Sequence, residues 1–258
     1  MKAEGAALVT GAGRGLGRAV AVELARRGFE VYATLRDPAR ADGLREAAAA
    51  AAVEIAVERL DVCAPESIAL PANLRVLVNN AGVDRENLPV EHAPMQLWRE
   101  MFETNLFGLV EVTRRAVPLL RTAGGGVICN LSSISVLSEV PFYAAYRASK
   151  AAVGALSESL RSELAAFGIR VVEVMPGPVE TDMLAASDKR PEAARYEGYT
   201  ELAENLWKGR RAVGPMAAPA ADAARDIADA ILDDDSPPRV PCDPLSAAQL
   251  KALDATSR

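Results

Sequence analysis

A tyrosine and a lysine stand four residues apart in the stretch Tyr146-Arg147-Ala148-Ser149-Lys150. On a helix this spacing places the phenol and the ammonium on one face, about 6 Å apart along the axis. A nearby cation stabilises phenolate, so the pKa of the tyrosine moves toward the range in which it can exchange a proton at neutral pH. Tyr143 has Arg147 four residues after it, but arginine is a poorer substitute for a compact ammonium. The spacing therefore favours Tyr146 as a general acid or base.

A second candidate site is a glycine-dense turn, Thr10-Gly11-Ala12-Gly13-Arg14-Gly15-Leu16-Gly17. Between a strand and a helix N-terminus, such a turn offers free backbone N–H groups, no Cβ in the way and the positive end of a helix dipole, which a pyrophosphate requires. The glycines follow GxxxGxG through Gly11, Gly15 and Gly17 rather than GxGxxG, and no Walker lysine follows. A tightly packed structural turn has the same composition, so this motif alone only suggests a dinucleotide site.

Polar residues also follow two other apolar runs and interrupt one predicted helix. Asn79-Asn80-Ala81-Gly82 closes the run 76–79, and Ser132 and Ser133 close the run 127–132. Asn105 stands inside the periodic segment 96–121, where its side chain competes for backbone hydrogen bonds. Each can be explained as a cap, a loop serine or an exposed helix residue. In an open α/β sheet, however, ligands bind at the carboxyl ends of the strands.

The composition excludes several classes of function. The chain has 258 residues and a formal net charge of −6, which argues against a nucleic acid as its main partner. His92 is the only histidine, so a His-rich metal site is impossible, and no Gly-x-Ser-x-Gly hydrolase motif is present. Cys63, Cys129 and Cys242 are too widely spaced for a disulfide framework, which predicts reduced thiols and a cytoplasmic location. Neither a signal peptide nor a membrane span is expected.

The elements that must position these residues alternate along the chain. Short apolar or β-branched runs predict strands at Ala6–Thr10, Glu30–Thr34, Val53–Leu60, Val76–Asn79, Val127–Ser132 and Val171–Met175, with a short edge strand at Arg239–Pro241. Helices are predicted at Gly15–Arg27, Arg40–Ala52, Gln96–Arg121, Tyr146–Phe167 and Asp222–Leu232. This alternation predicts one α/β domain over residues 1–258: a doubly wound parallel sheet of Rossmann type with helices on both faces.

Three regions fit the alternation less well. Residues 63–74 hold two prolines and are short for a crossover helix, so that layer is expected to be abbreviated. Residues 177–219 mix proline, glycine, tyrosine and tryptophan with charged residues, and we expect a substrate loop at about 183–215. After residue 241 we expect a polar tail.

Taken together, these motifs resemble the short-chain dehydrogenase/reductase family in order and spacing. The resemblance covers residues 5–182 and includes the 13 residues that separate Ser133 from Tyr146, the pair Asp61-Val62, and the stretch Pro176-Gly177-Pro178-Val179-Glu180-Thr181. Residues 31–37 further resemble the hydroxysteroid and retinol dehydrogenase members. The chain departs from the family at Val136, where a glycine is common, and in the short layer 63–74.

The resemblance implies hydride transfer between a nicotinamide and a carbonyl or carbinol carbon. Tyr146 would be the general acid or base, Lys150 would lower its pKa and hold the ribose, Ser133 would bind the substrate oxygen, and Asn105 would anchor a water. Asn80 would lie against the cofactor ribose, Asp61 and Val62 near the adenine, and Val179 and Thr181 at the carboxamide. The other implied cofactor contacts are Thr10, Gly11, Arg14, Gly15, Leu16, Gly17, Arg36, Ala81, Gly82, Pro176 and Gly177.

The second predicted strand bears on the choice of cofactor. It ends Thr34-Leu35-Arg36, so leucine stands where a carboxylate would bond the adenosine 2′-hydroxyl of NAD. Arg36 and Arg14 suit a 2′-phosphate, which predicts NADP(H) over NAD(H). Asp37 would reverse this prediction if the register were shifted by two residues.

The substrate side is mostly apolar. Leu137, Val140, Phe142, Tyr143, Met183 and Trp207 are expected to line the pocket, which favours a hydrophobic ketone or secondary alcohol, although loop packing or subunit contacts would use the same residues. Apolar residues on more than one side of the segment 146–167 predict a homodimer or homotetramer. Two alternatives are a non-catalytic dinucleotide-sensing protein, which would not need Ser133, Tyr146 and Lys150, and an extended sugar-nucleotide epimerase, which usually has a longer chain.

Overall fold

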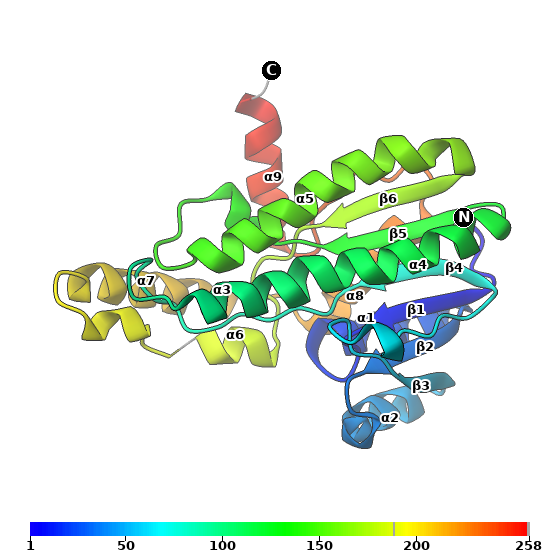
Figure 1. Ribbon diagram of the computed structural model, residues 1–258, viewed down its shortest axis with the longest axis horizontal. Coiled ribbons are helices and arrows are strands. Elements are labelled where there is room, and N and C mark those ends of the chain that lie inside the picture. The colour runs from blue at the N-terminus through cyan, green and yellow to red at the C-terminus, as the bar shows by residue number, and fades with distance from the viewer. Residues whose placement is uncertain (188, 257–258) are drawn as a thin grey trace.

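A computed structural model describes residues 1–187 and 189–256 of the chain. Its centre is a parallel sheet of seven strands in the order β3-β2-β1-β4-β5-β6-β7 (Figure 1). The strands are β1 (Ala6–Thr10), β2 (Glu30–Leu35), β3 (Ile55–Arg59), β4 (Leu74–Asn79), β5 (Gly126–Leu131), β6 (Ile169–Val174) and β7 (Arg239–Val240). The predicted Rossmann-type α/β fold is confirmed.

Helices cover both faces of this sheet because successive strand residues point to opposite sides. Ala7 and Val9 pack in one cluster with residues of α1 (Gly15–Arg27), α2 (Asp42–Ala50) and α8 (Ala220–Leu232). Leu8, between them, packs on the other face with residues of α4 (Gly108–Thr122) and α5 (Ala144–Leu164). The two cores hold the sheet rigid, so its carboxyl edge is a fixed platform for a site.

The strand order reverses between β1 and β4. Such a switch point opens a crevice at the carboxyl ends of the strands, where α/β sheets bind ligands. The glycine turn leaves β1 and the stretch Asn79–Gly82 leaves β4 at this point. Two motifs that lie 70 residues apart in the sequence therefore meet.

The helix predicted over 96–121 is present, but it contains a π-turn that the sequence did not predict. The segment forms α3 (Met95–Phe102), a π-helical turn (Glu103–Phe107) and α4. The wider π-turn directs Asn105 toward the protein interior, and only 1% of this residue is exposed. π-turns of this kind are frequent at functional sites because they displace one side chain from the helical ladder.

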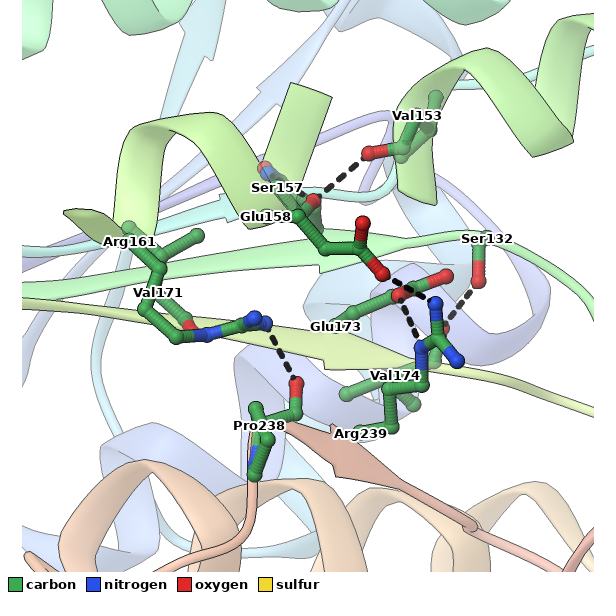
Figure 2. Close-up of polar contacts among 11 residues, drawn as sticks. Ser132, Val153, Ser157, Glu158, Arg161, Val171, Glu173, Val174, Pro238 and Arg239 are labelled. Atoms are coloured by element: carbon green, nitrogen blue, oxygen red, sulfur yellow. Dashed lines mark hydrogen bonds and ion pairs between the residues drawn. The ribbon is translucent and has the colours of Figure 1, made fainter. Parts of the chain in front are cut away.

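The edge of the sheet is fastened to α5, the helix that carries Tyr146 and Lys150. Glu173 of β6 is buried and accepts a hydrogen bond from Arg239 Nε of β7 at 3.2 Å, and the same guanidinium reaches Glu158 of α5 (Figure 2). Arg161 of α5 donates from Nη2 to the Pro238 carbonyl oxygen at 3.0 Å. These contacts tie α5 to β6 and β7.

Two predictions about the chain beyond β6 need correction or detail. The expected polar tail is wrong: residues Pro244–Thr256 form α9, capped by Asp243, whose Oδ1 accepts the Ser246 N–H at 2.9 Å. An aspartate followed by a proline is a helix-start signal, and Leu250 supplies a buried contact. Residues 177–219, called the excursion below, contain α6 (Asp182–Ser187), a 3₁₀ turn (Glu192–Arg195) and α7 (Thr200–Val213). Residue 188, inside the expected substrate loop, lies outside the described residues.

In Figure 1, α6 and α7 lie with α3 beyond the carboxyl ends of the strands, on the side of the switch point. The abbreviated layer after β3 is present as expected, with only a 3₁₀ turn at Pro65–Ser67. Within the described residues, no helix has both the length and the apolar character needed to cross a membrane.

Candidate active site at the carboxyl edge of the sheet

The glycine turn passes close to residues 80–84, which follow β4 and are called the β4 exit below. Side chains on the glycines would not fit there. A Cβ on Gly11, whose φ is +65°, would lie 2.9 Å from the Ala81 Cα, and one on Gly17 would lie 2.2 Å from Asn80 Nδ2. Gly15, with φ +55°, faces Thr181, whose Cγ2 would be 3.2 Å from an added Cβ. The backbone of this turn, called the cradle below, therefore packs closely on its neighbours at the N-terminus of α1, where backbone N–H groups favour an anionic group.

Thr10 and Asn80 fasten the two sides of the switch point. The Thr10 hydroxyl oxygen accepts the N–H groups of Asn80 and Ala81, each at 3.0 Å. Asn80 Nδ2 donates to the carbonyl oxygens of Thr10 at 2.8 Å and Gly11 at 3.1 Å. The structure thus directs the Asn80 amide into the glycine turn, where it fixes the cradle.

Asn105 holds the next part of the β4 exit. Its Oδ1 accepts the Val83 N–H at 2.7 Å, and its Nδ2 donates to the Val83 carbonyl oxygen at 2.9 Å and to Ser149 Oγ at 3.0 Å. Both amide hydrogens are thereby used. The same segment brings Gly82 over the site: an added Cβ there would be 3.3 Å from Asn105 Oδ1 and 3.4 Å from Lys150 Nζ.

Ser133, Tyr146 and Lys150 meet where β5 ends and α5 begins. The Ser133 hydroxyl hydrogen-bonds the Tyr146 phenol. Lys150 Nζ lies 6.0 Å from the centroid of the Tyr146 ring and donates to the Leu131 carbonyl oxygen at 2.9 Å. The i, i+4 spacing predicted from the sequence places both groups on one face of α5.

The electrostatics of this group are dominated by burial. Burial, followed by the negative charge of Asp84, raises the pKa of Tyr146 above its usual value, and the Ser133 hydroxyl lowers it in part. Burial lowers the pKa of Lys150 to about 8, and Asp84 opposes that change. The site favours the protonated phenol and holds an ammonium that can lose its charge near neutral pH.

The end of β2 places an apolar side chain beneath the glycine turn. Leu35 is buried, and its Cδ2 would be 2.5 Å from a Cβ on Gly13. Asp37 caps the following 3₁₀ turn, because its carboxylate accepts the Ala39 N–H at 3.1 Å. Arg36 is exposed, and Arg14 reaches across to Asp182 of α6 at 3.4 Å.

The loop after β6 is held from the C-terminal side. The Gly177 N–H donates to Asp243 Oδ2 at 2.6 Å, and Ser246 Oγ donates to the same oxygen at 2.7 Å. Val179 is buried, and the Thr181 hydroxyl donates to its carbonyl oxygen at 3.2 Å. The cap of α9 therefore positions the stretch 176–181 beside the cradle.

Asp61 and Val62 lie at the β3 end of the crevice. The Asp61 carboxylate accepts the Cys63 N–H at 3.0 Å, which closes a local turn. The Val62 side chain packs against Gly108 of α4, where an added Cβ would be 2.7 Å from the Val62 Cβ.

The six residues expected on the substrate side do not all gather in one place. Phe142 lines a small cavity with Tyr146, and the ring centroids of Tyr143 and Tyr146 are 6.1 Å apart. Leu137 instead packs in the cluster of Ile134, Met175 and Leu250, against α9. Val140 is half-buried, Met183 is 45% exposed on α6, and Trp207 lies on α7 with the Arg211 guanidinium 5.5 Å from its ring.

A larger cavity, of about 440 Å³, lies between the loop after β6 and α7. Its lining includes Thr181, Leu184, Arg210, Arg211 and Pro215. Because Thr181 also borders Gly15, this cavity continues the crevice from the cradle toward the excursion.

Three residues with a part in this site were missed in the sequence. Asp84 lines the small cavity with Tyr146, Asp243 holds the Gly177 loop, and Arg147 donates from Nε to the Ser135 carbonyl oxygen at 2.7 Å, just after Ser133. The Asp-Pro pair at 243–244 was a readable signal. Asp84 and Arg147 had none, because each acts across a distance that only the fold closes.

Among the described residues, no group of three or more histidine, cysteine, aspartate or glutamate side chains could hold a metal ion. Cys63, Cys129 and Cys242 are free thiols, of which the last two are buried.

A family model described as short chain dehydrogenase matches residues 5–192. The uncharacterized oxidoreductase YusZ of Bacillus subtilis (strain 168) is 43% identical over 190 residues, covering 70% of this chain and 67% of YusZ. Estradiol 17-beta-dehydrogenase 2 of Rattus norvegicus is 35% identical over 193 residues, covering 71% of this chain and 50% of that protein. The matched part thus spans about half the length of the rat relative.

Solved structures agree with this match. A short chain dehydrogenase from Burkholderia cenocepacia J2315 in complex with NADP has a TM-score of 0.76 and 28% identity, with 99% of this chain and 95% of that chain covered. A short chain dehydrogenase/reductase from Burkholderia phymatum in complex with NAD has a TM-score of 0.79 and 27% identity, with 99% and 96% covered. Similar structures therefore hold either dinucleotide.

Proposed function

Because this chain belongs to the short-chain dehydrogenase/reductase family of oxidoreductases, we propose that it transfers a hydride between NADP(H) and a hydrophobic ketone or secondary alcohol, with Tyr146 as the general acid and base. The observation that carries this proposal is the meeting of the Tyr146 phenol, the Ser133 hydroxyl and the Lys150 ammonium at the switch-point edge of the sheet. These are the groups needed to move one proton and stabilise one developing alkoxide.

The cradle fits a nicotinamide dinucleotide. It stands at the N-terminus of α1, so backbone N–H groups of the turn would hold the pyrophosphate, and Gly11 and Gly17 let the turn pack against residues 80 and 81 without a clash. The bound nicotinamide would supply or accept the hydride. Val179 and Thr181 would hold the carboxamide, and Lys150 would bind ribose hydroxyls with the donors it does not use on Leu131.

The proton is transferred by side chains on α5 and just after β5. In reduction, Tyr146 Oη donates its proton to the carbonyl oxygen while Ser133 Oγ stabilises the negative charge that develops there. In oxidation, the phenolate accepts the proton of the substrate hydroxyl. The ammonium of Lys150 would stabilise that phenolate, and the Ser133 hydroxyl already offsets part of the effect of burial on the Tyr146 pKa.

NADP(H) is proposed over NAD(H) on the basis of charge. Leu35 offers no carboxylate to an adenosine 2′-hydroxyl, and Asp37 is engaged as a cap with Ala39. The exposed guanidinium of Arg36 would bind the 2′-phosphate, joined by Arg14 once it leaves Asp182.

A hydrophobic substrate is proposed because Phe142 and Tyr143 flank Tyr146 and the small cavity beside it includes Leu97 and Trp98. We further propose one domain with a substrate loop at about 183–215, a homodimer or homotetramer, and a cytoplasmic location. The free thiols support the location, and the exposed Phe107 on the outer side of the α3–α4 junction supports the oligomer.

The experiment is turnover of a panel of hydrophobic ketones with NADPH, and of the corresponding alcohols with NADP⁺, followed by absorbance of the reduced nicotinamide. We expect turnover of several members, lost in Tyr146→Phe. NADPH binding, followed by quenching of Trp98 or Trp207 fluorescence, without turnover of any member would favour the alternative of a non-catalytic dinucleotide-binding protein.

A further inference from the structure

The carboxyl group of Asp84 is placed at the proton-transfer site by the fold. Asn105 clamps the residue before it, Val83, through both backbone groups, and Gly82 passes over Lys150 Nζ. Asp84 is the next side chain of this segment, and it lines the same small cavity as Tyr146. The β4 exit therefore delivers a carboxylate to the face of α5 that carries the phenol and the ammonium.

We propose that Asp84 is a positioning residue of this active site, whose carboxylate acts through Tyr146 and Lys150 and sets the pH range in which the pair exchanges a proton with the substrate. This inference rests on the proposed function for its kinetic consequence. The pairing of Asp84 with Lys150 can be measured without a substrate.

The charged and titratable groups that face Asp84 come from three elements. They are Arg85 and Glu86 on its own segment, Arg210 of α7, and Tyr146 and Lys150 of α5 with Tyr143 just before it. Arg210 also hydrogen-bonds Asn87 Oδ1, and its guanidinium lies 4.9 Å from the centroid of the Tyr143 ring, so α7 brings a positive charge to this group.

The balance among these groups leaves Asp84 charged at neutral pH. Burial raises the pKa of Asp84 to about 6, while the Arg85 N–H and the positive charges of Arg210 and Arg85 oppose this shift. Above that pH, the carboxylate keeps the Tyr146 phenol protonated and helps the buried Lys150 to keep its charge. A protonated phenol is the form that donates a proton in reduction, so Asp84 extends the pH range of reduction upward. Oxidation needs the phenolate, so its pH range also moves to higher pH.

Glu201 provides a matched control, as an exposed carboxylate on α7 that does not line the small cavity. Water screens its carboxylate, whereas the field of Asp84 acts through a poorly solvated cavity. Lys208 is the corresponding control for Lys150, as an exposed lysine on α7.

The first measurement is the titration of the Asp84 carboxyl carbon by NMR of protein labelled with ¹³C at aspartate carboxyls. Its resonance is assigned by its loss in Asp84→Asn. Because coupling between two sites is reciprocal, removing the ammonium in Lys150→Met should raise the pKa of Asp84 by on the order of half to one unit. Lys208→Met should leave it unchanged. An unchanged Asp84 titration in Lys150→Met would overturn the inference.

The second measurement is the pH profile of kcat/KM for reduction. In Asp84→Asn, which keeps the size of the side chain, we expect the alkaline limb to move down by on the order of one pH unit. The two profiles should converge below about pH 6, where Asp84 is protonated. Glu201→Gln should follow the unmodified enzyme. A purely structural role would lower kcat/KM at every pH without moving the limb, and that result would overturn the inference.

The two measurements separate this inference from the proposed function. Coupling of Asp84 to Lys150 without turnover of any carbonyl would count against the proposed function and leave the pairing standing. Turnover with no coupling, and with an unmoved limb in Asp84→Asn, would overturn the role of Asp84 alone.

Discussion

Asn105 and Val83 are joined by two hydrogen bonds across the mouth of the crevice, from the Val83 N–H to Asn105 Oδ1 at 2.7 Å and from Asn105 Nδ2 to the Val83 carbonyl oxygen at 2.9 Å. Asn105 is 1% exposed, so water has little access to replace it. The pair exists because the π-turn between α3 and α4 turns this asparagine inward. It fixes the segment that carries Gly82 and Asp84.

Replacing Asn105 by alanine should destabilise the protein and loosen the site together. The half-buried N–H and C=O of Val83 would lose their partners, which costs on the order of 1 to 3 kcal/mol in the free energy of unfolding. We expect this loss in urea denaturation, with a higher KM for the cofactor and a lower kcat. Glu103→Ala, at an exposed position of the same turn, is the control. Wild-type stability in Asn105→Ala would show that the clamp contributes nothing.

Tyr146→Phe should abolish turnover while Tyr143→Phe should not. The phenol of Tyr146 is hydrogen-bonded to Ser133 and shares a helix face with Lys150. Removing its hydroxyl should lower kcat by about 10² to 10⁴. Tyr143 lies under Arg210, and its loss should change mainly KM through pocket packing. NADPH binding to Tyr146→Phe, measured by tryptophan fluorescence, should survive. An active Tyr146→Phe beside an inactive Tyr143→Phe would reverse the assignment.

Arg36→Ala should erode a preference for NADPH. If its guanidinium binds the 2′-phosphate, kcat/KM should fall about tenfold or more with NADPH and change little with NADH. Steady-state kinetics with both cofactors measure this, and Arg26→Ala, exposed at the far end of α1, controls for net charge. Equal or better use of NADH by the unmodified enzyme would contradict the prediction.

Lys150→Met should make the protein more stable at neutral pH although it removes activity. Burial lowers the folded-state pKa of Lys150 to about 8, so below that pH folding must bury an ammonium. Removing it should raise the free energy of unfolding by on the order of 1 to 3 kcal/mol. Between about pH 8 and the ordinary lysine pKa, Lys150 is protonated only in the unfolded chain, so the stability of the unmodified protein rises with pH. The stability gained in Lys150→Met therefore shrinks over this pH range. Unfolding at several pH values, with Lys208→Met as the control, checks both the sign and the pH window.

The exposed Phe107 should belong to a contact between copies of the chain. It is 55% exposed at the π-turn, beside the outer face of α4. We expect a dimer or tetramer at micromolar concentration in light scattering, and Phe107→Glu should shift it toward smaller species. Met216→Glu, at an equally exposed apolar residue after α7, should leave the assembly intact. A wild-type monomer would contradict the prediction.

The sequence was sufficient for the fold because short apolar runs and helix-length segments are local signals, and their alternation leaves few topologies. It failed where a local pattern was ambiguous. The apolar residues of 96–121 predicted a helix but not the π-turn within it, and the polar composition after residue 241 concealed the helix start at Asp243-Pro244. The spacing of Tyr146, Lys150 and Ser133 could be read because two of these residues share a helix and the third ends a strand.

By itself, then, the sequence determined the family, the Rossmann-type sheet and the identity of the groups at its carboxyl edge. Only the tertiary structure decided what surrounds those groups. Asp84 stands 62 residues before Tyr146, and Asp243 stands 66 residues after Gly177, yet each pair shares one small volume. The physical reason is that burial and charge act through space, so the proton affinities of Tyr146 and Lys150 depend on neighbours that no local spacing reveals.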